Sequence, residues 1–133
     1  GPIAGFEYAM ESRDVFDSIH KCGRFLHEAY EEGTIVLTNE NGPWYVEWYG
    51  LLHLNVSSIS VDSLNSATNI TELVLDTIAE RHVQVIVVFE RLSYSLLDTY
   101  SLLHSNGYLE LIRSYSEVGG WRSIIYETDM SIR

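Results

Sequence analysis

The stretch Val83-Gln84-Val85-Ile86-Val87-Val88-Phe89 decides the fold of this chain. It is apolar at every position but Gln84, and most of its residues are β-branched. β-Branched residues favour extended backbone, and a strand that is apolar at successive positions is covered on both faces, as in the centre of a parallel sheet. We therefore expect a buried strand here, with helices packed against the sheet on both sides.

Helical patterns flank this strand in the sequence. Asn69 followed by Glu72 resembles a capping box, and it precedes apolar residues at helical spacing, namely Ile70, Leu73, Val74 and Ile78. This pattern predicts a helix that runs to about Arg81. After the strand, Ser93 can cap another helix, whose apolar positions are Leu96, Leu97, Tyr100 and Leu103. Ser105-Asn106-Gly107 marks the end of that helix.

The N-terminal part predicts a further amphipathic helix. Ser12 can cap it, and one apolar stripe then comprises Val15, Phe16, Ile19, Cys22, Phe25, Leu26, Ala29 and Tyr30. Gly33 suits the position after the helix end, where a left-handed conformation is usual. The pair Glu31-Glu32 is typical of a solvated helix end.

Three strands are expected between this helix and Asn69. They are Thr34–Thr38, Trp44–Tyr49 and His53–Val61, and the turn-forming residues 39–43 separate the first two. We expect these strands to form an antiparallel meander. The residues Ser63 to Thr68 are predicted to form a polar loop.

The C-terminal part starts with a predicted strand and ends ambiguously. The strand is Tyr108 to Ile112, with Leu109 and Leu111 facing the core. Gly119-Gly120 predicts a hairpin turn into a strand from Trp121 to Tyr126. The alternative is a helix from about Ser116, which the apolar periodicity favours and the two glycines oppose, at a cost of about 2 kcal/mol.

Length and element order predict one α/β domain over residues 3–133, because 133 residues suit a single core. Gly1-Pro2 look like the residues left by a protease-cleaved expression tag. The expected architecture is a mixed central sheet of about five strands flanked by helices. No stretch approaches the roughly 18 apolar residues that a membrane span needs, so no membrane contact is expected.

Charge and cysteine content indicate the environment and the partners. The formal charge is −11, so the domain repels nucleic-acid phosphates and favours a basic protein partner. Cys22 is the single cysteine, which excludes an internal disulfide and favours a reducing, intracellular compartment. Its apolar helical position indicates a small core residue rather than a nucleophile.

No motif for catalysis or cofactor binding is present. The chain lacks the glycine-rich phosphate loops and the G-x-S-x-G nucleophile motif. His20 and His27 are seven residues apart, two turns along one helix face, which is too far for close metal ligation. We therefore expect a protein that is not an enzyme and that has no cofactor and no metal site.

An aromatic segment supplies the candidate partner-binding residues. Both faces of the predicted strand Trp44–Tyr49 are largely aromatic, and Glu47 is its only acid. Stacking on nucleic-acid bases would need interleaved basic residues, and residues 34–80 contain no lysine or arginine. Tryptophan and tyrosine are favoured in protein interfaces, so the predicted partner-binding residues are Trp44, Tyr45, Trp48, Tyr49 and Trp121.

The predicted order of helix, three-strand meander, helix and buried strand resembles the core of restriction-endonuclease-like nucleases. The second half resembles the central domain of the XPF family, in particular its inactive partner subunits. The resemblance covers about residues 50 to 128 and is a pattern of hydrophobicity and turns. It is carried by Val83 to Phe89, Leu96 to Leu103, Tyr108-Leu109-Glu110-Leu111-Ile112 and Ser114-Tyr115-Ser116-Glu117-Val118-Gly119-Gly120-Trp121. It favours the helical alternative for the tail.

The resemblance implies a domain without nuclease activity. Active members carry Glu-Arg-Lys on the third strand with flanking aspartates, which bind a divalent metal and orient water. The corresponding segment here, Ser58-Ile59-Ser60-Val61-Asp62, retains one aspartate and no lysine.

The implied function is a nuclear pseudonuclease scaffold. It would pair with an XPF-like subunit in DNA repair or meiotic recombination and would contact nucleic acid only through that complex. The alternative is a small acidic module of the immunity or inhibitor kind, which masks a basic nuclease through complementary charge.

Overall fold

The computed structural model describes residues 20–39, 53–89, 94–116 and 122–129. It confirms an α/β fold with a mixed five-stranded sheet flanked by helices. The strands are β1 (Ile35–Thr38), β2 (Asn55–Ser58), β3 (Val85–Phe89), β4 (Leu109–Ser116) and β5 (Arg122–Thr128). The helices are α3 (Val61–Ser66), α4 (Ile70–Arg81), α5 (Tyr94–Ser105) and a helical segment at residues 20–29.

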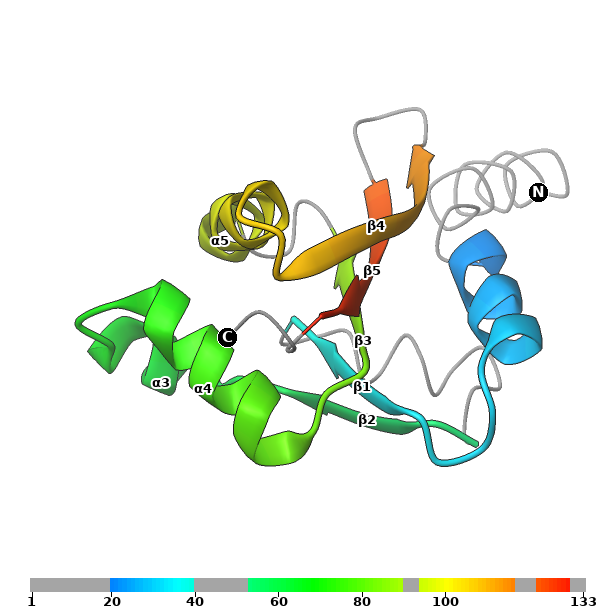
Figure 1. Cartoon of the computed structure of the whole chain (residues 1–133), viewed down its shortest axis with the longest axis horizontal. Helices are drawn as coiled ribbons and strands as arrows, with labels where there is room; N and C mark the ends of the chain where they lie inside the picture. The colour runs from blue at the N-terminus through cyan, green and yellow to red at the C-terminus, as the bar shows by residue number, and fades with distance from the viewer. Residues whose placement is uncertain (1–19, 40–52, 90–93, 117–121, 130–133) are drawn as a thin grey trace, which may run out of the picture.

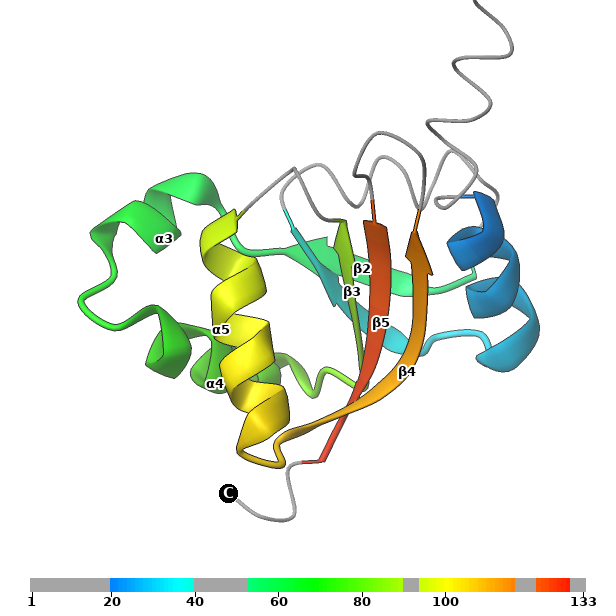
Figure 2. The ribbon, with the colours of Figure 1, turned by 90° about the horizontal axis from the view of Figure 1, so that it is seen from above.

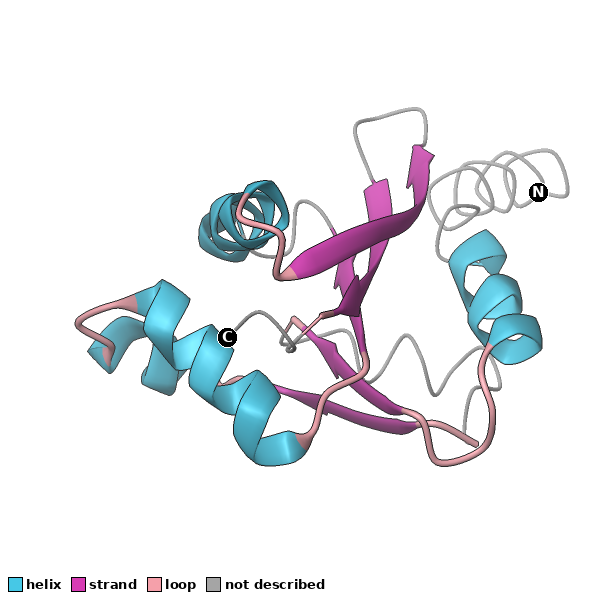
Figure 3. Cartoon of the chain, in the orientation of Figure 1, coloured by secondary structure: helices cyan, strands magenta, loops and turns pink. Residues whose placement is uncertain are grey.

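The helices lie in two layers with the sheet between them. Figure 1 shows α3, α4 and α5 on one side of the sheet and the helix of residues 20–29 on the other. Figure 3 shows the same separation of helices and strands. None of the helices in the described ranges is long and apolar enough to cross a bilayer.

The strand order β2-β1-β3-β5-β4 corrects the predicted meander. β1 pairs in parallel with β2 on one side and with β3 on the other. No position between β1 and β2 is therefore left for the predicted strand Trp44–Tyr49, whose residues lie outside the described ranges. The antiparallel part of the sheet is instead β3-β5-β4. The sequence pattern predicted the strands that correspond to β1 and β2, but it did not predict that these two pair directly.

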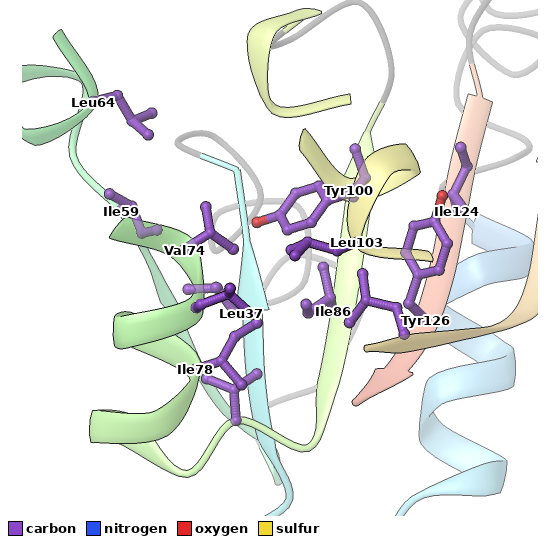
Figure 4. Packing of buried hydrophobic residues seen from close by; sticks show 14 residues of the cluster. Leu37, Ile59, Leu64, Val74, Ile78, Ile86, Tyr100, Leu103, Ile124 and Tyr126 are labelled. Atoms are coloured by element: carbon purple, nitrogen blue, oxygen red, sulfur yellow. The ribbon is translucent and has the colours of Figure 1, made fainter. Parts of the chain in front are cut away.

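Strand β3 is the centre of the fold, as its sequence predicts. All five of its residues are buried, and they alternate between two hydrophobic clusters. Ile86 and Val88 face α4 and α5, where Figure 4 shows Ile86 with Tyr100 and Leu103. The other face, with Val85, Val87 and Phe89, packs with Cys22 and Leu26 of the helix of residues 20–29. The sequence predicted that β3 would lie between two parallel strands. Its neighbour β1 is parallel, but its other neighbour, β5, is antiparallel.

Helix α4 begins and ends where the sequence predicts. The Asn69 side chain accepts a hydrogen bond from the Glu72 N–H at 3.2 Å, and the helix ends at Arg81. The preceding segment corrects the predicted loop, since Val61–Ser66 form α3. Ser60 caps this helix by accepting from the Ser63 N–H at 3.1 Å, and Leu64 is buried. A helix this short has too few apolar positions for periodicity to reveal it.

The tail is a strand, as the pair Gly119-Gly120 predicted, and not the helix that the family resemblance favours. β5 pairs antiparallel with both β3 and β4, so its backbone groups are satisfied within the sheet. β4 also extends to Ser116, beyond the predicted end at Ile112. The turn residues Gly119-Gly120 lie outside the described ranges.

Leu111 does not face the core, contrary to prediction. Leu109 is 3% exposed, whereas Leu111 is 46% exposed. β4 is at the edge of the sheet, and Figure 2 shows that it starts beside the end of α5 and then runs away from that helix. A register shift between Leu111 and Arg113 further alters which side chains face inward.

Candidate protein-binding site

The predicted aromatic partner-binding residues cannot be placed. Trp44, Tyr45, Trp48, Tyr49 and Trp121 lie outside the described ranges, as does Glu47. They remain predictions from the sequence.

The stretch expected to match the nuclease strand is not one strand. β2 ends at Ser58, and Asp62 lies in the first turn of α3 with its side chain exposed. The chain changes from strand to helix within this stretch because Ser60 caps α3. Asp62 therefore does not project from the sheet, which corrects its expected position.

Cys22 is a core residue, as its place in the apolar stripe predicts. Its side chain is 1% exposed and packs in the cluster with Leu26 and Val85. Burial raises the pKa of the Cys22 thiol to about 12, so the thiol is protonated at neutral pH. A protonated, inaccessible thiol is a poor nucleophile.

The structure brings two histidines together that the sequence did not connect. The rings of His27 and His53 meet edge to face with their centroids 4.8 Å apart. His53 Nε2 also lies 3.3 Å from the Tyr30 carbonyl oxygen. Among the described residues, no group of three or more histidine, cysteine, aspartate or glutamate side chains could hold a metal ion. We interpret the pair as a contact that anchors the start of β2 to the helix.

A polar hollow lies where the helix of residues 20–29 ends beside the sheet. It is bounded by the start of β1, the start of β3 and the end of β5. Its lining residues are Ala29, Tyr30, Glu31, Thr34, Gln84, Val85, Glu127 and Thr128. We refer to it as the acidic hollow, because its charged lining residues are Glu31 and Glu127.

Tyr30 and Glu127 form the central contact of the acidic hollow. The Tyr30 hydroxyl donates a hydrogen bond to Glu127 Oε1 at 3.2 Å. Burial, and next the nearby Glu127 carboxylate, raise the pKa of the Tyr30 phenol. Tyr30 therefore remains a donor at neutral pH, and it fixes one carboxylate oxygen of Glu127.

Hydrogen bonds to backbone groups fix the walls of the acidic hollow. Gly33 has φ +84°, and its N–H donates to the His53 carbonyl at 2.8 Å. Gln84 Oε1 accepts from the Ile35 N–H at 3.1 Å, so the Gln84 side chain joins the starts of β3 and β1. The Thr128 hydroxyl donates to the Val83 carbonyl at 2.8 Å. The hollow is thus built on the sheet and on the left-handed turn that follows the helix.

Among the described residues, the charged side chains that line the acidic hollow are both carboxylates. Glu28 and Glu32 are exposed nearby on the chain, and Glu110 is close enough to raise the pKa of Tyr30. Glu28, Glu31 and Glu32 also crowd the C-terminal end of a helix, where the helix dipole disfavours negative charge. An incoming cationic group would relieve this repulsion. The arrangement can therefore bind a lysine or arginine side chain from a partner.

Sequence reasoning assigned Tyr30 to the apolar stripe and Glu31-Glu32 to a solvated helix end. Both assignments hold, since Tyr30 packs partly against the core and the two glutamates are exposed. The hollow itself was missed because Glu127 is 97 residues from Tyr30. The excess of acid in the composition was the only signal that pointed to it.

Comparison with known proteins identifies no relative. No protein-family model matches the chain, and neither a curated protein nor a solved structure matches it.

Proposed function

We infer that this chain is a non-catalytic protein-binding domain, an XPF-like pseudonuclease that acts as a scaffold by heterodimerising with an XPF-like partner subunit. The process would be DNA repair or meiotic recombination, and the location nuclear. The observation that carries the binding role is the acidic hollow, where the Tyr30 hydroxyl holds the Glu127 carboxylate beside Glu31.

The acidic hollow supports binding of a basic protein surface. A guanidinium or ammonium group that enters it can meet the carboxylates of Glu127 and Glu31, which both line the hollow. Charge-assisted hydrogen bonds of this kind contribute about 1.5–3 kcal/mol each when they are shielded from water. The negative charge of the domain would also speed the encounter with a basic partner.

The identity of the partner rests on the sequence resemblance in the second half of the chain. β3, α5 and the start of β4 have the order that the resemblance implies. The parallel pairing of β1 with β2 and the strand at the tail depart from it. Under this proposal the basic partner contacts nucleic acid, because the acidic domain itself repels phosphates.

A second function is favoured by the same hollow. An immunity or inhibitor protein would use the acidic surface to cover the basic active site of a nuclease. This alternative uses the charge directly and needs no resemblance to a family. The two functions differ in the partner, which can be identified.

The test is affinity capture with the full chain from its native cells, followed by mass spectrometry. The double variant Glu31→Gln and Glu127→Gln keeps hydrogen-bonding groups in the hollow and removes both charges. The matched control, Glu80→Gln with Asp98→Asn, removes two exposed charges on α4 and α5. We expect the hollow variant to lose the partner and the control to retain it.

Capture of an XPF-like subunit that depends on Glu31 and Glu127 would support the pseudonuclease scaffold. Capture of a basic nuclease with the same dependence would support the inhibitor function instead. Capture that is equal for both variants would contradict a role for the acidic hollow. Alanine at Trp44, Trp48, Tyr49 and Trp121 tests the aromatic prediction separately, because unchanged affinity would exclude those residues from the interface.

A further inference from the structure

Most of the positive charge in the described part of this acidic protein gathers at one place. Of the five lysine and arginine residues in the described ranges (Lys21, Arg24, Arg81, Arg113 and Arg122), three lie at a hollow between the helix of residues 20–29 and β4. The hollow is lined by Lys21, Arg24, Phe25, Glu28 and Tyr115, and Arg113 adjoins it. We refer to it as the basic hollow. It shares no lining residue with the acidic hollow.

Helix periodicity and the edge strand place these side chains together. Lys21, Arg24, Phe25 and Glu28 recur at three- and four-residue spacing and so share one side of the helix. From β4, the Arg113 guanidinium carbon lies 5.1 Å from the centre of the Phe25 ring. This cation–π contact holds one guanidinium group at the edge of the hollow.

The two aromatic rings provide an apolar floor. Phe25 and Tyr115 are half-buried and pack against the core cluster around Leu26. Burial is the main cause that raises the pKa of Tyr115, so its hydroxyl is protonated at neutral pH. The hollow thus combines an apolar floor with guanidinium groups that can bind carboxylate oxygens in a bidentate way.

We propose that the basic hollow binds a short acidic segment of a partner protein. Carboxylates of that segment meet Arg24 and Arg113, and an apolar side chain between them rests on Tyr115 and on the part of the Phe25 ring that Arg113 leaves uncovered. This surface is separate from the acidic hollow, so the inference does not depend on the proposed function.

The surrounding charge favours a peptide over a nucleic acid. Glu28 lines the basic hollow, and Glu31 and Glu32 follow at the end of the same helix. A nucleic-acid strand carries a phosphate at every nucleotide, so it would extend from the three basic residues onto these carboxylates. A peptide can present one or two carboxylates and continue without charge. Such a peptide keeps the attraction to the basic residues of the hollow and avoids the repulsion from Glu31 and Glu32.

A titration of the isotopically labelled full chain, followed by nuclear magnetic resonance, tests this proposal. The probe is a synthetic peptide with a central phenylalanine flanked by aspartates, and the control peptide has asparagine in their place. We expect saturable shifts at Arg24, Phe25, Arg113 and Tyr115 with the aspartate peptide only. Arg113→Lys should weaken binding about tenfold, the equivalent of one charge-assisted hydrogen bond, and the charge reversal Arg24→Glu should weaken it by at least as much.

Two further variants sharpen the test. Glu28→Gln should strengthen binding, because it removes the carboxylate that opposes the ligand. Ser101→Glu with Asn106→Asp adds the same negative charge as Arg24→Glu at exposed positions on and after α5, and it should leave binding unchanged. Equal binding of the asparagine peptide, or no saturable shift, would overturn the proposal. An oligodeoxythymidine that binds at these residues when the peptide does not would also overturn it and assign the hollow to nucleic acid.

Discussion

The side chain of Asn39 joins the end of β1 to the end of β3 through Phe89. Its Nδ2 donates to the Phe89 carbonyl at 2.9 Å, and its Oδ1 accepts from the Phe89 N–H at 3.1 Å. Asn39 is fully buried, so the amide replaces a pair of backbone hydrogen bonds where strand pairing stops.

Asn39→Ala is expected to lower the free energy of unfolding by about 2–4 kcal/mol, because the two buried hydrogen bonds between Asn39 and the Phe89 backbone are lost. Urea unfolding followed by circular dichroism measures this. Asn106→Ala, at an exposed turn, is the matched control and should have no effect. A loss equal to that of the control would show that water or other groups satisfy Phe89.

Two tyrosines should respond in opposite ways to removal of the hydroxyl. The Tyr100 hydroxyl is buried and has no hydrogen-bond partner among the described residues, and Figure 4 shows it directed toward Val74. Tyr100→Phe should therefore raise the free energy of unfolding by about 1 kcal/mol. Tyr30→Phe loses the bond to Glu127 and should lower it by about 1 kcal/mol. Changes of the same sign in both variants, measured by urea unfolding, would contradict this assignment.

Alkaline pH should destabilise the protein through Cys22. Burial raises the pKa of this thiol from 9.0 to about 12, so the unfolded chain releases the proton first. The contribution of the protonated thiol is complete below pH 9 and is lost as the pH rises toward 12.

Cys22→Ala removes this part of the pH dependence. When the pH rises from neutral into the window from 9 to 12, the urea midpoint of the Cys22→Ala variant should fall less than that of the unchanged protein. Parallel curves for the two proteins would exclude the thiol as the cause. Reaction of Cys22 with a thiol reagent should likewise require unfolding, since the side chain is 1% exposed.

Substitutions at two residues with left-handed backbone should change the free energy of unfolding in opposite directions. Gly33 has φ +84°, and a Cβ there would meet no atom within 4 Å, so Gly33→Ala costs only conformational energy, about 1 kcal/mol. His82 has φ 56° at the end of α4, and its side chain is exposed. His82→Gly should raise the free energy of unfolding by about 0.5 kcal/mol. Thermal unfolding of both variants checks the pair, and a less stable His82→Gly would contradict the strain assigned to His82.

The elements that were predicted well have strong signals within a few residues. The β-branched run of β3, the Asn69 cap of α4 and the glycine after the helix of residues 20–29 are examples. The elements that were predicted wrongly or left open depend on distant parts of the chain. Leu111 is exposed because β4 leaves α5, and the tail is a strand because β3 offers it a free edge.

The sequence by itself determined the class of fold, the buried central strand, the Asn69 cap of α4 and the acidic character of the protein. Each of these follows from backbone preference, apolar periodicity or composition, which act locally or sum over the chain. Only the tertiary structure decided that β1 lies between β2 and β3, that Tyr30 meets Glu127 and that Arg113 covers Phe25. These contacts join residues far apart in the chain. They form only when the pairing of strands and the packing of helices satisfy both faces of the sheet at once.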